Sequence, residues 1–424
     1  MSDLTWINAA LTAARPQVLG ALLRYFRDMD TAEEAFQDAC LRALKNWPTN
    51  GPPRDPKAWL IIVGRNAALD GVRRGAKQTA LPPEELLSDL EDAETNLAER
   101  LDESRYRDDV LRLLFMCCHP DLPATQQIAL ALRVVSGVSV KRIARAFLVG
   151  EAAMEQRITR AKARIADANL SFETPGAIEH THRLQAVAAM IYLVFNEGYS
   201  AADAVARDEL CGEAIRLGRL LLRMFTTEPE VMGLMALMLL QHARTPARFD
   251  TAGEIVLLED QDRALWEGKM IAEGLALVDK AIRARQPGPY QVQAAIAALH
   301  ARAARVEDTD WREIALLYAT LERMQPSPVV TLNKAVAISK VEGPEAALAV
   351  IAPLADRLAG YFYFFGVKGA LLLQLGRNRE AHAAFDRAIA LANTPAEAAH
   401  IRQHLDRLQE NFAAPVGAGK SRSS

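Results

Sequence analysis

Basic and amide side chains recur at helical spacing between residues 151 and 166. At about 100° per residue they divide between two flanks of a helix. One flank carries Gln156, Arg157, Arg160 and Arg164, and the other carries Lys162. Side chains of these types bind phosphates and the edges of bases in the major groove of DNA. The side chains of this segment therefore favour recognition of paired DNA. The alternative interpretation of the segment is an ordinary helical hairpin with a solvated basic face.

Two short helices joined by a tight turn are predicted to position these side chains. Ser139 is a good N-cap for the first helix, and Gly150 can adopt the positive φ that the turn needs. In the second helix apolar residues recur at i, i+4, i+7 and i+11, as Met154, Ile158, Ala161 and Ile165. Such a stripe faces a core and leaves the polar flanks outside. This is the geometry of a helix-turn-helix that enters a major groove.

A second helical segment, residues 56–77, combines an aromatic residue with clustered basic side chains. Its candidates are Trp59, Arg65, Asn66, Asp70, Arg73 and Arg74. Bases stack on aromatic rings and phosphates meet cations, so the segment suits an opened DNA strand. Arginines near the end of a helix also stabilise its dipole, which is the structural alternative. Before it lie a helical pattern capped by Thr31 and a loop over residues 48–56.

The stretch AEEAFQDACLRALKNW followed by AWLIIVGRNAALDGVRR resembles region 2 of the extracytoplasmic-function group of bacterial RNA polymerase sigma factors. The helix-turn-helix at residues 139–166 resembles region 4 of the same group. One departure is Ala152-Ala153-Met154, which stands where the family often has Gly-Thr-Val and bears on promoter specificity. The resemblance implies a protein that binds core RNA polymerase, recognises promoter DNA and promotes transcription initiation.

The resemblance implies a role for each candidate residue. The helix 32–47 would dock on the β′ subunit of core polymerase through exposed side chains, namely Glu33, Glu34, Asp38 and Arg42. The candidates within residues 58–74 would hold the −10 element as a single strand. Gln156, Arg157, Arg160, Lys162 and Arg164 would contact the −35 element. The β subunit is a further expected polymerase contact. The alternative function is a helix-turn-helix regulator that acts without polymerase and has a tetratricopeptide-like sensor domain.

The whole chain is predicted to be all-α, with several domains. Region 2 would occupy residues 1–78, an acidic linker 79–109, region 4 110–170, a helical extension 171–412 and a flexible tail 413–424. From about residue 265 the extension resembles tetratricopeptide repeats, most clearly in Phe365, Gly369, Leu372, Gly376, Ala381, Phe385 and Ala388. A generic helical array is the alternative. We expect the extension to regulate activity, by packing on the DNA-binding regions or by binding a protein partner.

Composition and residue pattern limit the other functions. The 424 residues carry a net charge of −3 and four cysteines, without a secretory pattern or an apolar run of membrane-spanning length. These features predict a cytoplasmic protein that does not engage a membrane. Cys117-Cys118-His119 lacks a second ligand cluster at zinc spacing, so a buried helix end is expected there instead of a metal site. Neither a nucleophile–base pair nor a Gly-rich phosphate loop stands out, so we expect neither an enzyme nor a cofactor.

Overall fold

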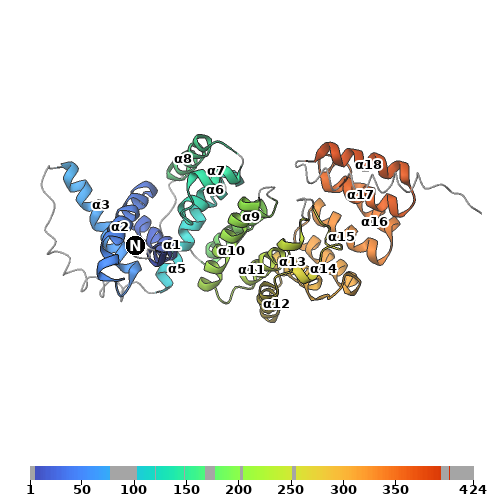
Figure 1. Ribbon diagram of the computed structural model, residues 1–424, viewed down its shortest axis with the longest axis horizontal. Helices are drawn as coiled ribbons and strands as arrows, with labels where there is room; N and C mark the ends of the chain where they lie inside the picture. The colour runs from blue at the N-terminus through green and yellow to red at the C-terminus, as the bar shows by residue number, and fades with distance from the viewer. Residues whose placement is uncertain are drawn as a thin grey trace, which may run out of the picture. The chain divides into compact units, whose positions relative to one another are not determined.

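The computed structural model of the chain describes residues 5–76, 103–119, 121–147, 149–167, 177–200, 204–250, 255–392 and 401 (Figure 1). Within these ranges the only strand-like pairing is an isolated bridge between Phe249 and Ile255, and the prediction of an all-α fold is confirmed. No helix in the described ranges is long and apolar enough to cross a membrane. The chain divides into two compact units, Met1–Leu217 and Gly218–Ser424.

Three helices that pack against one another open the first unit: α1 (Thr5–Phe26), α2 (Met29–Asn50) and α3 (Pro56–Ala76). Each contributes apolar side chains to the core, among them Leu22, Phe36 and Leu60. A Cβ at Gly64 would lie 2.8 Å from the carbonyl oxygen of Ala35, so a glycine is needed where α3 meets α2. The packing of the bundle therefore determines which sides of α2 and α3 are buried and which are exposed.

Helix α2 begins earlier and ends later than its sequence pattern predicted. Asp28 is the N-cap, and the expected role of Thr31 is wrong. The Asp28 carboxylate accepts hydrogen bonds from the backbone N–H of Thr31 at 2.7 Å and from its hydroxyl at 2.5 Å. A carboxylate suits this position because it also complements the helix dipole. At the other end, Pro48 lies inside the helix, which stops at Gly51 with φ 77°. The predicted loop is thus shorter than expected.

Four helices form the helix-turn-helix part of the unit: α5 (Glu103–Cys117), α6 (Ala124–Val134), α7 (Val140–Ala146) and α8 (Glu151–Asp167). Ser139 caps α7 as predicted, accepting a hydrogen bond from the Arg142 N–H at 3.4 Å. The apolar stripe of α8 is also confirmed, since Met154, Ile158, Ala161 and Ile165 are all buried.

The turn between α7 and α8 differs from the prediction, because Gly150 does not adopt a positive φ. Its carbonyl instead accepts a hydrogen bond from the Met154 N–H at 3.0 Å, which starts α8 directly. Gly137, between α6 and α7, has the positive φ, at 71°. The glycine with left-handed backbone geometry is thus Gly137, in the loop before α7, and not Gly150 in the loop after it.

Helix α5 joins the helix-turn-helix part to the three-helix bundle, because it packs on both α1 and α6. Asp109 is buried in this contact and pairs with Arg24 at 3.4 Å and Arg112 at 3.3 Å. Residues 103–109, expected to belong to the acidic linker, are therefore helical, since these pairs hold Asp109 within α5. Residues 79–102 of that predicted linker and the predicted tail 413–424 lie outside the described residues.

Two further helices, α9 (Ala177–Ser200) and α10 (Ala204–Met224), follow the helix-turn-helix part in the chain and contact it. Helix α9 packs on α5 and α6, where the Arg183 guanidinium lies 4.9 Å from the centre of the Phe115 ring. Arg142 of α7 pairs with Glu209 of α10 at 3.1 Å. The beginning of the predicted extension thus packs directly on the predicted region 4.

The second unit is a series of paired helices. They are α11 (Pro229–His242), α12 (Gly268–Arg283), α13 (Pro289–Arg302), α14 (Trp311–Met324), α15 (Pro328–Val341), α16 (Pro344–Ile351), α17 (Phe362–Gln374) and α18 (Asn378–Leu391). Consecutive helices pack along the series. In the last pair a Cβ at Gly369 would lie 2.5 Å from the Phe385 ring, and Ala381 and Ala388 are fully buried. The tetratricopeptide-like spacing therefore reflects close helix pairing, as predicted.

Candidate nucleic-acid and polymerase interface

The outer face of α8 carries three of the predicted DNA-contacting side chains in solvent: Gln156, Arg160 and Arg164. Arg160 Nη2 donates a hydrogen bond to Gln156 Oε1 at 3.1 Å, and Arg164 Nη1 donates one to the Asp121 carbonyl at 3.5 Å. Arg157 is half-buried beside them. Because the apolar stripe anchors the opposite side of α8, this face presents guanidinium and amide groups that can donate to phosphates and base edges.

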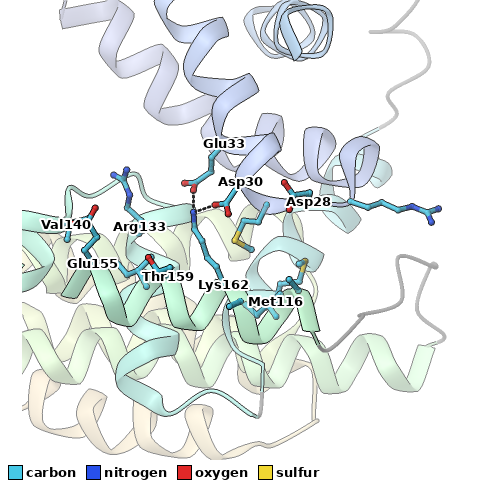
Figure 2. A pocket seen from close by; sticks show the side chains of 15 residues that line it. Asp28, Asp30, Glu33, Met116, Arg133, Val140, Glu155, Thr159 and Lys162 are labelled. Atoms are coloured by element: carbon cyan, nitrogen blue, oxygen red, sulfur yellow. Dashed lines mark hydrogen bonds and ion pairs between the residues drawn. The ribbon is translucent and has the colours of Figure 1, made fainter. Parts of the chain in front are cut away.

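Lys162 differs from the other candidates on α8 because its ammonium forms ion pairs with carboxylates of another helix. Its ammonium lies 2.7 Å from Asp30 Oδ1 and 2.5 Å from Glu33 Oε2, both on α2 (Figure 2). Burial alone would lower the pKa of Lys162, but hydrogen bonds to the two carboxylates outweigh it and raise the pKa. The amine therefore stays charged at neutral pH, and this ion pair links the helix-turn-helix to the three-helix bundle.

Glu33 is the clearest correction among the predicted polymerase-binding residues. It was expected to be exposed, but only 6% of its surface is accessible. The physical reason is its pairing with two cations, since Arg15 Nη2 of α1 lies 3.3 Å from the carboxylate oxygen that Lys162 does not contact. A buried carboxylate is retained where cations compensate its lost hydration. The other three candidates, Glu34, Asp38 and Arg42, are exposed beside Leu41.

Arg15 strengthens the same junction through the backbone of α6. Its Nε donates to the Val134 carbonyl at 2.9 Å and its Nη2 to the Arg133 carbonyl at 3.3 Å. These acceptors lie at the C-terminal end of α6, where carbonyl groups lack helical partners and carry the negative end of the dipole. A cavity of about 380 Å³ borders the junction, with Glu155 and Thr159 on its α8 side (Figure 2). Arg15, Glu33 and Lys162, which we call the junction residues, thus connect α1, α2, α6 and α8.

The predicted single-strand surface on α3 is described only in its first half. Trp59 is half-buried, with its ring edge-on to the buried Trp47 ring at 5.5 Å, so it also packs the core. Asn66 is half-buried, and Arg65 turns toward α1, where its guanidinium lies 5.7 Å from the centre of the Tyr25 ring. Asp70, Arg73 and Arg74 belong to α3, but their side chains lie outside the described residues.

Sequence reasoning missed Arg15, Asp30 and Tyr25 as site residues. Arg15 lies within α1, and Asp30 precedes Thr31, the residue that was expected to cap the second helix. Neither has a motif position, because Arg15 bonds a carbonyl of α6 and Asp30 bonds Lys162 of α8, each more than a hundred residues away. Tyr25 was recoverable in part, because an aromatic flanked by Arg24 and Arg27 at a helix end is itself a cationic and aromatic cluster.

The adjacent cysteines lie at a buried helix end, as predicted. Cys117 ends α5, and both Cys117 and Cys118 are buried. Burial raises the pKa of the Cys118 thiol to about 12 and that of Cys117 well above its usual value. Among the described residues, no group of three or more His, Cys, Asp or Glu side chains converges to hold a metal ion.

Comparison with known families gives three matches along the chain. Residues 11–78 match the model of Sigma-70 region 2, and residues 112–165 match that of Sigma-70 region 4. Residues 183–282 match a family of unknown function, DUF6596. The first two matches contain α2–α3 and α7–α8, the helices that carry the candidate residues. The third spans the described helices from α9 to α12.

A curated relative covers nearly the whole chain. It is the uncharacterized protein R00370 of Rhizobium meliloti (strain 1021), which is 69% identical over 411 residues, or 96% of this chain and 97% of the relative. Among solved structures, the crystal structure of yeast Tom70 aligns with 92% of this chain and 82% of its own at 13% identity. Its TM-score of 0.24 is too low to support any assignment.

Proposed function

Because the chain belongs to the extracytoplasmic-function-like RNA polymerase sigma factors with a C-terminal extension, we propose specific roles for its helices in transcription initiation. The observation that carries the proposal is the α7–α8 helix-turn-helix, whose Gln156, Arg160 and Arg164 are exposed on one face. This face reads or clamps the −35 element through the major groove and its phosphates, with Arg157 at its edge.

Helix α3 holds the −10 element after the strands separate. Stacking on Trp59 and polar contacts from Asn66 suit an unpaired strand, and Arg65, Asp70, Arg73 and Arg74 complete the proposed set. The half-burial of Trp59 supports a shallow stacking platform that the Trp47 contact keeps rigid. The polymerase performs all bond making, and the chain supplies recognition alone, in the cytoplasm where polymerase and chromosome meet.

Helix α2 docks on the β′ subunit of core polymerase through its outer face. Glu34, Asp38 and Arg42 lie one helical turn apart along this face, and Leu41 is 56% exposed beside them. In the proposed complex Leu41 would supply apolar contact area and the charged side chains a polar rim. Glu33 supports this face from within, and we remove it from the set of direct polymerase contacts. The β subunit remains a proposed contact of the helix-turn-helix part.

The junction residues keep regions 2 and 4 together before polymerase binds. The −10 and −35 elements are about 25 base pairs apart, or roughly 85 Å at 3.4 Å per base pair. Direct contact between Lys162 and Glu33 is incompatible with α3 and α8 occupying both elements at once. Assembly with polymerase therefore breaks this ion pair and frees Lys162 for the −35 element. The extension favours the closed form or receives a protein partner that opens it, since α9 packs on α5 and α6 and an ion pair joins α10 to α7.

Transcription in vitro tests the proposal directly. The full chain and core polymerase from the source bacterium would be combined with a library of promoter fragments. We expect discrete transcripts only when both proteins are present. Asp38→Lys should weaken binding to core polymerase, whereas the matched change Asp279→Lys on an exposed position of α12 should not. Absence of both transcripts and binding to core polymerase would reject the proposal.

A further inference from the structure

The cavity of about 380 Å³ beside the junction residues is lined by both sigma regions. Met29 and Asp30 come from α2, whereas Glu155 and Ile158 come from α8. Its volume is near the lower end of the range for small-ligand pockets, about 300–1,000 Å³. A small molecule that fills this cavity would therefore contact α2 and α8 at the same time.

Two charged side chains of the lining have spare hydrogen-bonding capacity. Within the described ranges of the chain, the Glu155 carboxylate forms neither a hydrogen bond nor an ion pair. The half-buried Arg133 guanidinium donates there only to the Val138 carbonyl, at 3.5 Å, which is a weak hydrogen bond. Figure 2 shows both side chains pointing out of the helix-turn-helix part to the side on which α2 lies. Glu155 can therefore accept from a cationic group in the cavity, and Arg133 can donate to an anionic one.

The other charges of the lining limit the net charge of a ligand. Asp28 accepts from Thr31, and Lys162 pairs with Asp30 and Glu33, so these carboxylates already have partners. The charged side chains of the lining nearly balance, because three are basic and four are acidic. A ligand with a large net charge of either sign would meet several like charges at short range. The cavity therefore suits a molecule that carries one charge of each sign.

Apolar side chains form the rest of the wall. Met29, Met116 and Ile158 are buried and line the cavity from three different helices. Methionine side chains adapt to irregular apolar shapes, so this wall suits a short aliphatic chain. We propose that the cavity binds a small zwitterion of the amino-acid class. Its carboxylate lies on the Arg133 guanidinium, its ammonium on the Glu155 carboxylate and its methylene groups against the apolar wall.

Such a ligand would restrain transcription by favouring the closed form of the chain. This part of the inference rests on the proposed separation of regions 2 and 4 when polymerase binds. The ligand can contact α2 and α8 together only while the two regions are joined, so it binds the closed form more tightly. By linkage, the ligand weakens binding of core polymerase, and polymerase weakens binding of the ligand by the same factor.

Isothermal titration calorimetry of the free full chain tests the site. The probes are amino acids whose two charges lie progressively further apart: glycine, β-alanine, γ-aminobutyrate, δ-aminovalerate and ε-aminocaproate. We expect one length to bind best, and n-butylamine and n-butyrate to bind more weakly because each fills one end of the site. Glu155→Gln should weaken the best probe about 10-fold or more, the usual effect of losing a hydrogen bond to a charged group. The matched control is Glu151→Gln, an exposed acidic residue at the start of α8.

A charge reversal tests the orientation of the ligand. Glu155 is exposed, so Glu155→Lys should fold as the wild type does. The variant should lose the best zwitterion and bind instead the dicarboxylate with the same number of methylene groups, because both ends of the site are then cationic. Arg133→Met should bind neither, whereas Arg283→Met on an exposed position of α12 should bind as the wild type does. A purely structural role for these side chains would not exchange one ligand for the other.

Binding to core polymerase tests the regulatory part. At saturating concentration the best probe should weaken that binding about 5-fold or more, and it should have no effect on Glu155→Gln. If no probe binds the free chain, or if Glu155→Gln and Glu155→Lys bind the probes as the wild type does, the site is refuted. If the probe binds at these residues but leaves the affinity for polymerase unchanged, the regulatory part is wrong and the site stands. If the chain without a probe fails to bind polymerase, the proposed function fails, and the calorimetric result for the site is unaffected.

Discussion

The ammonium of Lys162 lies 2.5 Å from a carboxylate oxygen of Glu33, so α8, the helix that we propose reads DNA, is tied to α2, the helix that we propose docks on polymerase. The two residues are 129 positions apart in the sequence. Glu33 is buried and Lys162 nearly so, which makes the pair less accessible to salt than a surface ion pair. One contact therefore joins the two helices that carry the proposed binding faces.

Arg15→Met should loosen this closed arrangement without altering either proposed binding face. The change removes a cation beside buried Glu33 and two hydrogen bonds to α6, at a cost of about 1–3 kcal/mol. Dyes attached at Lys45→Cys and Ala152→Cys, both exposed, would report the distance between regions 2 and 4. We expect lower energy transfer in the free Arg15→Met protein than in the wild type.

The matched control for that experiment is Arg42→Met, because Arg42 is an exposed arginine on the outer face of α2. It should leave energy transfer in the free protein unchanged. Equal transfer in all three proteins, with equal urea midpoints, would mean that the junction residues do not hold the regions together.

Arg160→Ala should weaken binding of holoenzyme to promoter DNA by about 1–3 kcal/mol if the guanidinium contacts a base edge, and by less if it meets only a phosphate. Fluorescence anisotropy at several salt concentrations separates the two cases, because a lost phosphate contact lowers the salt slope by about one. Arg283→Ala on an exposed position of α12 is the control. Unchanged affinity for both Arg157→Ala and Arg160→Ala would exclude these residues from −35 recognition.

The second unit should lose stability in mild acid through His300. Burial, with nearby Arg244 and Arg263, lowers the pKa of His300 from 6.5 to about 4. Below pH 6.5 His300 is protonated in the unfolded chain but stays neutral in the folded chain down to about pH 4. The free energy of unfolding therefore decreases as the pH drops from 6.5 toward 4. The full effect is about 3 kcal/mol.

Thermal unfolding of the wild type and His300→Phe between pH 7 and pH 4.5 measures this effect. The phenyl ring can keep the edge contact that His300 makes with Trp311 at 5.2 Å. We expect a shallower loss of melting temperature in the variant. Parallel pH profiles would show that another group controls the acid sensitivity of this unit.

The native thiols should resist alkylation while the chain is folded. Burial raises the pKa of Cys40 to about 11 and that of Cys118 to about 12, and Cys117 and Cys211 are fully buried. Since the thiolate is the reactive form, iodoacetamide at pH 8 should modify none of the four quickly. Mass spectrometry before and after urea treatment measures the difference. Rapid modification of Cys118 in the folded protein would contradict its burial.

Local patterns predicted most of the helices because their causes lie within a few residues. Ser139 and the apolar stripe of α8 are examples, since capping and periodicity involve only neighbours in the chain. Asp28 and Thr31 show the limit of such signals. Both are good N-caps three residues apart, and only the path of the backbone selects Asp28.

Side-chain environment was predicted less well than helix position. The exposure expected for Glu33 was wrong because its partners come from α1 and α8, and no periodicity within α2 encodes them. Arg65 was grouped with Asn66 from its type alone, although a rotation of about 100° separates neighbouring residues and turns Arg65 toward α1. Contacts between distant helices decide such cases.

The packing of α9 on α5 and α6 makes the first helix of the extension part of the core beneath region 4. A stop codon after residue 167 would leave a chain with both sigma regions, yet it would uncover the side of α5 where Phe115 meets Arg183. That product would expose apolar surface and tend to aggregate. The extension therefore shields the surface of region 4, and we expect both sigma regions to need α9 in order to stay in solution.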